Sequence, residues 1–122
     1  MCSFDADESP RSIQLYGVDP GVMAEAVSMI VAEDLADHID INMGCPVPKV
    51  TRKGGGAALP WKLDLFAAIV SGAVSTANVE SDRRGVRRVP VTVKMRMGID
   101  VDHLTYREAG VIAAQAGVAW VA

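Results

Sequence analysis

The order of strand-like and helix-like segments constrains the fold of this chain more than any other feature of its sequence. Short β-prone runs recur three times, and each is followed by a longer segment with apolar residues at helical spacing. Such alternation is typical of parallel strands connected by helices, so the sequence predicts an α/β fold. Strands are expected at 12–17, 38–43 and 91–97, with the start of a fourth at 118–122. The order alone leaves open a doubly wound sheet or a part of an eight-stranded barrel.

Three helices are expected between these strands. The first begins after the N-cap Asp19, with proline at the first helical position, and continues to about residue 36. The last is expected to be capped by Asp102 and to end at Gly117. The middle helix is expected over 60–77, and residues 78–90 are interpreted as a polar connection. The apolar residues at helical spacing in the first helix are Val22, Ala26, Met29 and Ile30.

Each expected strand has one apolar and one polar face, because successive side chains alternate between the two sides of a strand. Near the carboxyl ends, the polar faces carry Gln14, Asn42 and Lys94. A parallel sheet usually has apolar residues on both faces, and a buried lysine is unfavourable unless it is paired. Two interpretations stay open. The strands are partly exposed with solvated polar faces, or their carboxyl ends form a ligand site, as they do in many α/β proteins.

Composition limits the class of protein. With 122 residues, half of them apolar, the chain is long enough for one domain with a core. It has no apolar run of ~18 residues that would indicate a membrane span. The polar residues 1–11 lack the features of a secretory signal and are expected to be a disordered N-terminus, which leaves 12–122 as the folded domain. Two cysteines far apart favour free thiols in a reducing, cytoplasmic setting.

The net charge of −3 is unevenly distributed. Residues 43–58 contain Lys49, Arg52 and Lys53 without an acidic residue, and residues 78–90 carry a charge of +2. Two basic segments therefore lie in an otherwise acidic chain. Each is interpreted either as a solvated loop or as part of a surface for a polyanion such as RNA.

Cys45 directly follows the second expected strand, in the segment "INMGCP" (41–46), at the same end as the polar groups. One interpretation is a small buried apolar residue, and the other is a reactive thiol. No histidine lies near it at a spacing typical of nucleophile activation, so proton donation suits this thiol better than attack on carbon. The two cysteines and two histidines show no metal-ligand spacing. The glycine-rich run after Cys45 lacks the lysine and hydroxyl of a P-loop.

Three segments together resemble the tRNA-dihydrouridine synthases: "IQLYG" (13–17), "DINMGCPVPKVTRKGGGAAL" (40–59) and "VPVTVKMRMG" (89–98). They occur in the order found in that family, and the resemblance covers residues 11–122. It implies a partial TIM barrel of about three and a half βα units that binds FMN. The implied activity is the reduction of uridine in tRNA to 5,6-dihydrouridine, with NADPH as reductant.

The same resemblance implies roles for individual residues. Cys45 corresponds to the family's catalytic cysteine, which protonates C5 of a flipped-out uracil while reduced flavin delivers hydride to C6. Gln14 and Lys94 correspond to positions that contact flavin, and Asn42 to a position beside flavin and substrate. Contacts to flavin or tRNA are implied more loosely for Lys49, Arg52, Lys53 and Arg96.

The chain is about half as long as the ~250 residues of a TIM barrel. The FMN-phosphate loops and the helical tRNA-binding domain of the family have no counterpart in this sequence. A half barrel with open strand edges is expected to self-associate, to misfold or to require the missing half, and to hold FMN poorly. Two alternatives stay open: another FMN-barrel oxidoreductase acting on a free pyrimidine, and a non-catalytic RNA-binding remnant.

Overall fold

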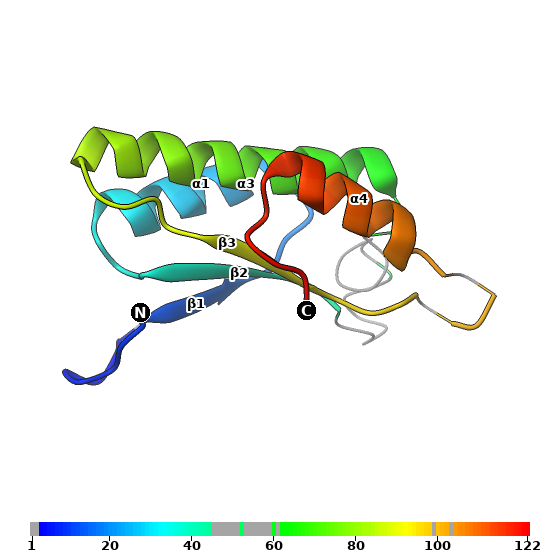
Figure 1. Cartoon of the computed structure of the whole chain (residues 1–122), viewed down its shortest axis with the longest axis horizontal. Coiled ribbons are helices and arrows are strands. Elements are labelled where there is room, and N and C mark those ends of the chain that lie inside the picture. The colour runs from blue at the N-terminus through cyan, green and yellow to red at the C-terminus, as the bar shows by residue number, and fades with distance from the viewer. Residues whose placement is uncertain (1–2, 45–51, 53–59, 61, 99, 103) are drawn as a thin grey trace.

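The computed structural model is an α/β structure in which three parallel strands form one sheet (Figure 1). The structure describes residues 3–44, 52, 60, 62–98, 100–102 and 104–122. The strand order is β1-β2-β3, and both neighbouring pairs are parallel, as predicted. The elements in chain order are β1 (Ser12–Leu15), α1 (Pro20–Ala32), β2 (His38–Met43), α3 (Leu63–Arg84), β3 (Val91–Met95) and α4 (Tyr106–Ala116).

The three predicted strands are confirmed, although β1 and β3 end earlier than expected. β3 ends at Met95, because its partner residue Met43 is the last residue of β2. The expected fourth strand is represented by a parallel bridge between Val93 and Val121. Residues 119–122 form further backbone hydrogen bonds with β3, so the chain continues the parallel sheet beyond its third strand.

The helices lie on one side of the sheet and cover the apolar side chains of the strands (Figure 1). Ile13, Ile41 and Val93 are almost inaccessible to solvent, which confirms the apolar face predicted from strand alternation. Helix α3 is the centre of the helical layer, because both α1 and α4 pack against it. The hydrophobic core therefore lies between the helices and one face of the sheet, and the polar strand faces lie on the other side.

Helix α1 begins as predicted. Asp19 Oδ1 accepts a hydrogen bond from Val22 N at 2.9 Å, and Pro20 is the first helical residue. The apolar side expected from the sequence is partly wrong, because Val22 and Met29 are 64% and 52% exposed. Apolar residues surround much of this helix, so periodicity could not select the side that packs. The buried residues are Met23, Val27, Ile30 and Val31.

The prediction for the middle helix is wrong at its C-terminal end. Helix α3 runs to Arg84, so residues 78–84 form about two further turns instead of a connection. Gly85 ends the helix in the left-handed conformation, with φ of 65°. Ser81 is the only buried residue of these added turns, and the apolar periodicity that predicts a helix is therefore weak there.

Helix α4 starts later than predicted. Its N-cap is Thr105, so the predicted cap at Asp102 is wrong. An antiparallel bridge between Gly98 and Leu104 occupies the residues before the helix, and the first helical residue is Tyr106. The end agrees with the prediction, because Gly117 adopts a left-handed conformation with φ of 87°.

Ion pairs around Arg11 hold the N-terminal end of the sheet. Its guanidinium lies 2.9 Å from Asp37 and 3.2 Å from Asp34, and Arg84 contacts the same Asp34 carboxylate at 3.1 Å. The hydrogen bonds from Arg11 lower the pKa of Asp37 to about 2 and also lower the pKa of Asp34. These contacts connect the start of β1 to the loop before β2 and to the end of α3.

Residues 3–10 precede the first strand, and Phe4 packs against the edge of the core. The disorder expected for residues 1–11 stays a prediction. No helix within the described residues is long and apolar enough to cross a membrane.

Ser81→Ala is expected to destabilise the protein by about 1–3 kcal/mol, because a buried donor loses its acceptor. Ser81 Oγ accepts a hydrogen bond from Val89 N at 3.1 Å and donates one to Ala77 O at 2.7 Å. Urea unfolding measures the change in free energy. Ser75→Ala, at an exposed position of the same helix, is the matched control with an expected change within about 0.5 kcal/mol. Equal effects of the two substitutions would contradict the proposed role of Ser81.

Asp37→Asn is expected to lower stability at neutral pH and to weaken its dependence on pH between about 4 and 2. Folding lowers the pKa of Asp37 from 3.8 to about 2, so the ionised carboxylate stabilises the folded state above this range. That contribution is lost as the pH falls through the folded-state pKa. Unfolding midpoints across a pH series measure the effect, with Asp64→Asn as a control at an exposed carboxylate of α3. An unchanged pH profile in Asp37→Asn would contradict the assignment.

Candidate functional site

Three polar side chains selected from the sequence lie together at the carboxyl ends of the strands. The register places Gln14 of β1 opposite Asp40 of β2, and Asn42 of β2 opposite Lys94 of β3. Gln14 and Lys94 are exposed and Asn42 is half-buried, on the sheet face that α1, α3 and α4 do not cover. The structure thus brings Gln14, Asn42 and Lys94 together at the end of the sheet that is formed by the carboxyl ends of the strands, as strand alternation predicted. This end of the sheet, on the face without helices, is called the polar edge.

A chain of hydrogen bonds connects β1 and β2 at this edge. Gln14 Nε2 donates to Asp40 Oδ2 at 2.7 Å, and Asn42 Nδ2 donates to Gln14 Oε1 at 3.1 Å. Asn42 Oδ1 in turn accepts from Gly44 N at 2.9 Å, so the chain reaches the backbone just before Cys45. Each of the two amides retains one hydrogen and one lone pair for a further partner.

A second chain starts at Asp40 and runs toward the N-terminal ends of the strands. Thr92 Oγ1 donates to Asp40 Oδ1 at 2.6 Å and lies 2.8 Å from His38 Nε2. His38 Nδ1 lies 3.0 Å from Ser12 Oγ, and Trp120 stacks on its ring at 5.2 Å between centroids. Asp40, Thr92 and His38 were not among the site residues predicted from the sequence. Strand alternation could have found them, because all three occupy the polar face.

Lys94 and Arg96 differ in what they contact. Among the described residues, the ammonium group of Lys94 has no hydrogen-bond or ion-pair partner. Arg96 Nε donates to Gly44 O at 2.8 Å, so this guanidinium holds the backbone at the end of β2. Lys94 therefore offers a cation for an anion or an electron-rich ring, whereas part of Arg96 is already engaged with the protein.

Four of the residues selected from the sequence fall in the segment directly after Gly44. Cys45, Lys49 and Lys53 lie outside the described residues, and Arg52 is described as exposed. Their roles stay predictions. The described chain approaches the thiol as far as Gly44, whose N–H and carbonyl are held by Asn42 and Arg96.

The second basic segment, residues 78–90, lies at the opposite end of the sheet, and much of its charge is paired. Arg83 contacts Glu80 at 2.9 Å, and Arg88 contacts Asp82 at 3.1 Å. A surface for a polyanion needs cations that remain available to phosphate groups. The structure therefore favours solvated, internally paired charges over a polyanion surface at this segment.

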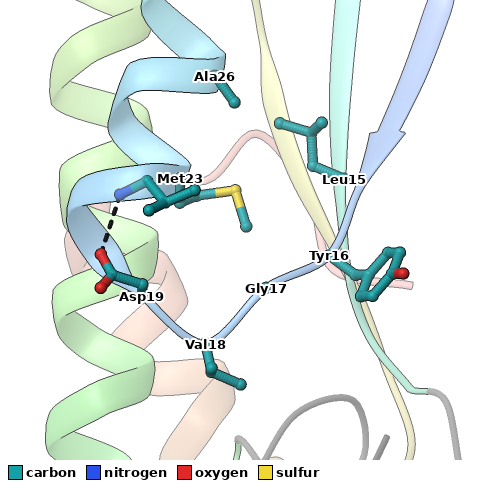
Figure 2. A pocket seen from close by; sticks show the side chains of 8 residues that line it. Leu15, Tyr16, Gly17, Val18, Asp19, Met23 and Ala26 are labelled. Atoms are coloured by element: carbon teal, nitrogen blue, oxygen red, sulfur yellow. Dashed lines mark hydrogen bonds between the residues drawn. The ribbon is translucent and has the colours of Figure 1, made fainter.

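Figure 2 shows a small pocket beside the carboxyl end of β1. It lies between β1 and α1, and its lining includes Leu15, Val18, Val22 and Met23. Its volume of about 150 Å³ is below the ~300–1,000 Å³ of most small-molecule sites. Since Leu15 and Met23 belong to the helix-covered side of the sheet, this pocket is separate from the polar edge.

Parallel strands, helices on one face and polar groups at the carboxyl ends define an α/β protein with a candidate ligand site where such folds bind ligands. The model of the dihydrouridine synthase (Dus) family matches residues 1–122. The chain therefore belongs to the dihydrouridine synthase family, as the three sequence segments indicated.

Curated relatives agree with this assignment. The probable tRNA-dihydrouridine synthases of Mycobacterium tuberculosis and Mycobacterium leprae are 57% and 53% identical over 122 residues, which is 100% of this chain and 30% of each relative. The tRNA-dihydrouridine synthase B of Pseudomonas aeruginosa is 40% identical over 114 residues, which covers 93% of this chain and 31% of the relative. The chain thus spans slightly less than a third of the length of these relatives.

Gln14→Glu is expected to destabilise the protein at neutral pH and to regain stability in acid. The variant places a second carboxylate where Gln14 Nε2 lies 2.7 Å from Asp40 Oδ2, and repulsion raises the pKa of one carboxyl in the folded state. The penalty is therefore present above about pH 5 and is relieved as the pH falls and a proton is bound. Unfolding free energies across this range measure the effect.

Gln14→Met is the uncharged control, because it also removes the donor to Asp40 but adds no charge, although it additionally removes the oxygen that accepts from Asn42 Nδ2. It is expected to show no recovery in acid. If Gln14→Glu were as stable as the wild type at neutral pH, the contact between Gln14 and Asp40 would be refuted.

Proposed function

We propose that this chain supplies the flavin-facing part of a tRNA-dihydrouridine synthase, folded as a partial TIM barrel of about three and a half βα units. The reaction is the reduction of uridine in tRNA to 5,6-dihydrouridine, with FMN as cofactor and NADPH as reductant. The observation that supports this most strongly is the family match over the whole chain, together with polar side chains at the carboxyl ends of three parallel strands. TIM-barrel enzymes carry their catalytic residues at this face.

The residues at this edge fit FMN. Lys94 offers an exposed cation without a partner among the described residues, which suits an electron-rich ring. Gln14 and Asn42 each retain an amide hydrogen and a lone pair, which match the donors and acceptors of a heterocycle. When bound and reduced by NADPH, the flavin would supply the hydride that uracil accepts at C6.

Cys45 is proposed to donate the proton that uracil accepts at C5. The thiol follows Gly44 in the sequence, and the N–H and carbonyl of Gly44 are held by Asn42 and Arg96, so the residue before the thiol has a defined backbone position. The basic residues in the sequence after Cys45 provide positive charge for tRNA phosphates. They are Lys49, Arg52 and Lys53.

Cys45→Ala in the complete gene product is expected to abolish dihydrouridine formation in an unmodified tRNA transcript supplied with FMN and NADPH. The reason is that no proton donor remains for C5. FMN binding, followed by flavin absorbance, is expected to persist, because the thiol is not among the groups proposed to hold the cofactor. Nucleoside mass spectrometry measures dihydrouridine, and Cys2→Ala is the matched control that keeps activity.

Dihydrouridine formation at the wild-type rate in Cys45→Ala would refute the proton-donor role. Reduction of free uracil as fast as that of tRNA would favour the alternative FMN oxidoreductase acting on a free pyrimidine. Binding of RNA without any binding of FMN would favour the non-catalytic alternative.

A further inference from the structure

Asp40 is the point at which two hydrogen-bond chains meet. One carboxylate oxygen accepts from Gln14 Nε2 at 2.7 Å, and the other accepts from Thr92 Oγ1 at 2.6 Å. An ionised carboxylate can only accept hydrogen bonds, so every group along both chains must order its donors and acceptors to match. Asp40 is half-buried on the middle strand, and its hydrogen bond with Thr92 is partly buried, whereas its hydrogen bond with Gln14 is exposed.

The amide chain is anchored at both ends. Beyond Gln14 and Asn42 it ends at the backbone N–H of Gly44, which can only donate. Two amides therefore stand between a group that only accepts and a group that only donates. A single arrangement satisfies all three hydrogen bonds, with the nitrogen of each amide toward Asp40 and the oxygen of each toward Gly44. Rotation of either amide by half a turn would oppose two donors or two acceptors.

The second chain determines which nitrogen of His38 carries hydrogen. Thr92 donates its hydroxyl hydrogen to Asp40, so toward His38 Nε2, at 2.8 Å, it can only accept. A neutral His38 therefore carries its hydrogen on Nε2. Its Nδ1 then accepts from the hydroxyl of Ser12 at 3.0 Å.

We propose that Asp40 is a positioning residue: its acceptor oxygen, together with the Gly44 N–H at the other end of the chain, holds the Gln14 and Asn42 amides in one orientation next to the residue that precedes Cys45. Because the Gln14 amide is held in place, its remaining N–H hydrogen and its remaining oxygen lone pair each keep a defined direction. The Gln14 side chain therefore loses less conformational entropy when a heterocycle binds. The consequence for FMN rests on the proposed function, whereas the order of the hydrogen bonds does not depend on it.

Asp40→Asn tests the hydrogen-bond order without any cofactor. The anchored amide chain requires an acceptor at residue 40, so the new amide oxygen must face Gln14 and its nitrogen must face Thr92. Thr92 then accepts, and its hydroxyl hydrogen turns toward His38 Nε2. Nitrogen NMR at mildly alkaline pH is expected to show His38 with hydrogen on Nε2 in the wild type and on Nδ1 in Asp40→Asn.

The chain has only one other histidine, His103, so His103→Gln assigns the NMR signals. Asp19→Asn makes the same chemical change at the N-cap of α1, retains an acceptor there and is expected to leave His38 unchanged. Hydrogen on Nδ1 in the wild type, or an unchanged His38 in Asp40→Asn, would overturn the proposed order.

Measuring the FMN affinity of the complete gene product shows whether Asp40 acts as a hydrogen-bond acceptor or through its negative charge. Asp40→Ala removes the acceptor and is expected to weaken FMN binding roughly five- to tenfold, the factor that corresponds to one lost hydrogen bond. Asp40→Asn retains an acceptor for Gln14 and is expected to stay within about twofold of the wild type. Equal loss in the two variants would refute the positioning role. A wild-type protein that binds no FMN would refute the proposed function and leave the NMR result to decide the hydrogen-bond order.

Discussion

The alternation of side chains along three parallel strands is the constraint on which the rest of this structure depends. The strands pair in a defined register, so residues of one parity on all three strands lie on one face. One parity places Ile13, Ile41 and Val93 under the helices, and the other forms the hydrogen-bonded polar face. A shift of one strand by one residue would exchange the two sets. Burial of the core and assembly of the candidate site are therefore consequences of the same pairing.

The two ends of the sheet are stabilised differently. At the N-terminal end, Arg11 is surrounded by the carboxylates of Asp34 and Asp37, and these charges are satisfied within the chain. At the carboxyl end, the cation of Lys94 has no partner among the described residues, and the amides keep unused hydrogen-bonding groups. The paired charges at the N-terminal end suit a structural role. The unused hydrogen-bond donors and acceptors at the carboxyl end suit the binding of a ligand. This division agrees with parallel α/β folds, in which stability resides at the amino ends of the strands and function at the carboxyl ends.

Local sequence was sufficient to predict where a helix starts or ends when the residue at that position has one dominant structural use. Asp19 and Pro20 start α1, and Gly117 ends α4, because capping depends on neighbouring backbone groups. Sequence was insufficient where the decisive partner is distant. The last turns of α3 are polar, and their stability involves the hydrogen bond between Ser81 and Val89, a residue beyond the end of the helix. Similarly, the buried side of α1 is selected by α3 and the sheet.

The sequence by itself determined the succession of parallel strands and helices, the two faces of each strand, the family, and the grouping of Gln14, Asn42 and Lys94 at one edge. These follow from periodicity and from motifs, which are local properties of the chain. Only the tertiary structure decided that Asp40 joins Gln14 to Thr92, and that Arg96 holds Gly44. The reason is that a hydrogen bond between strands depends on register and atomic distance. Strand alternation places a side chain on a face, but it cannot specify which atom of a neighbouring strand that side chain reaches.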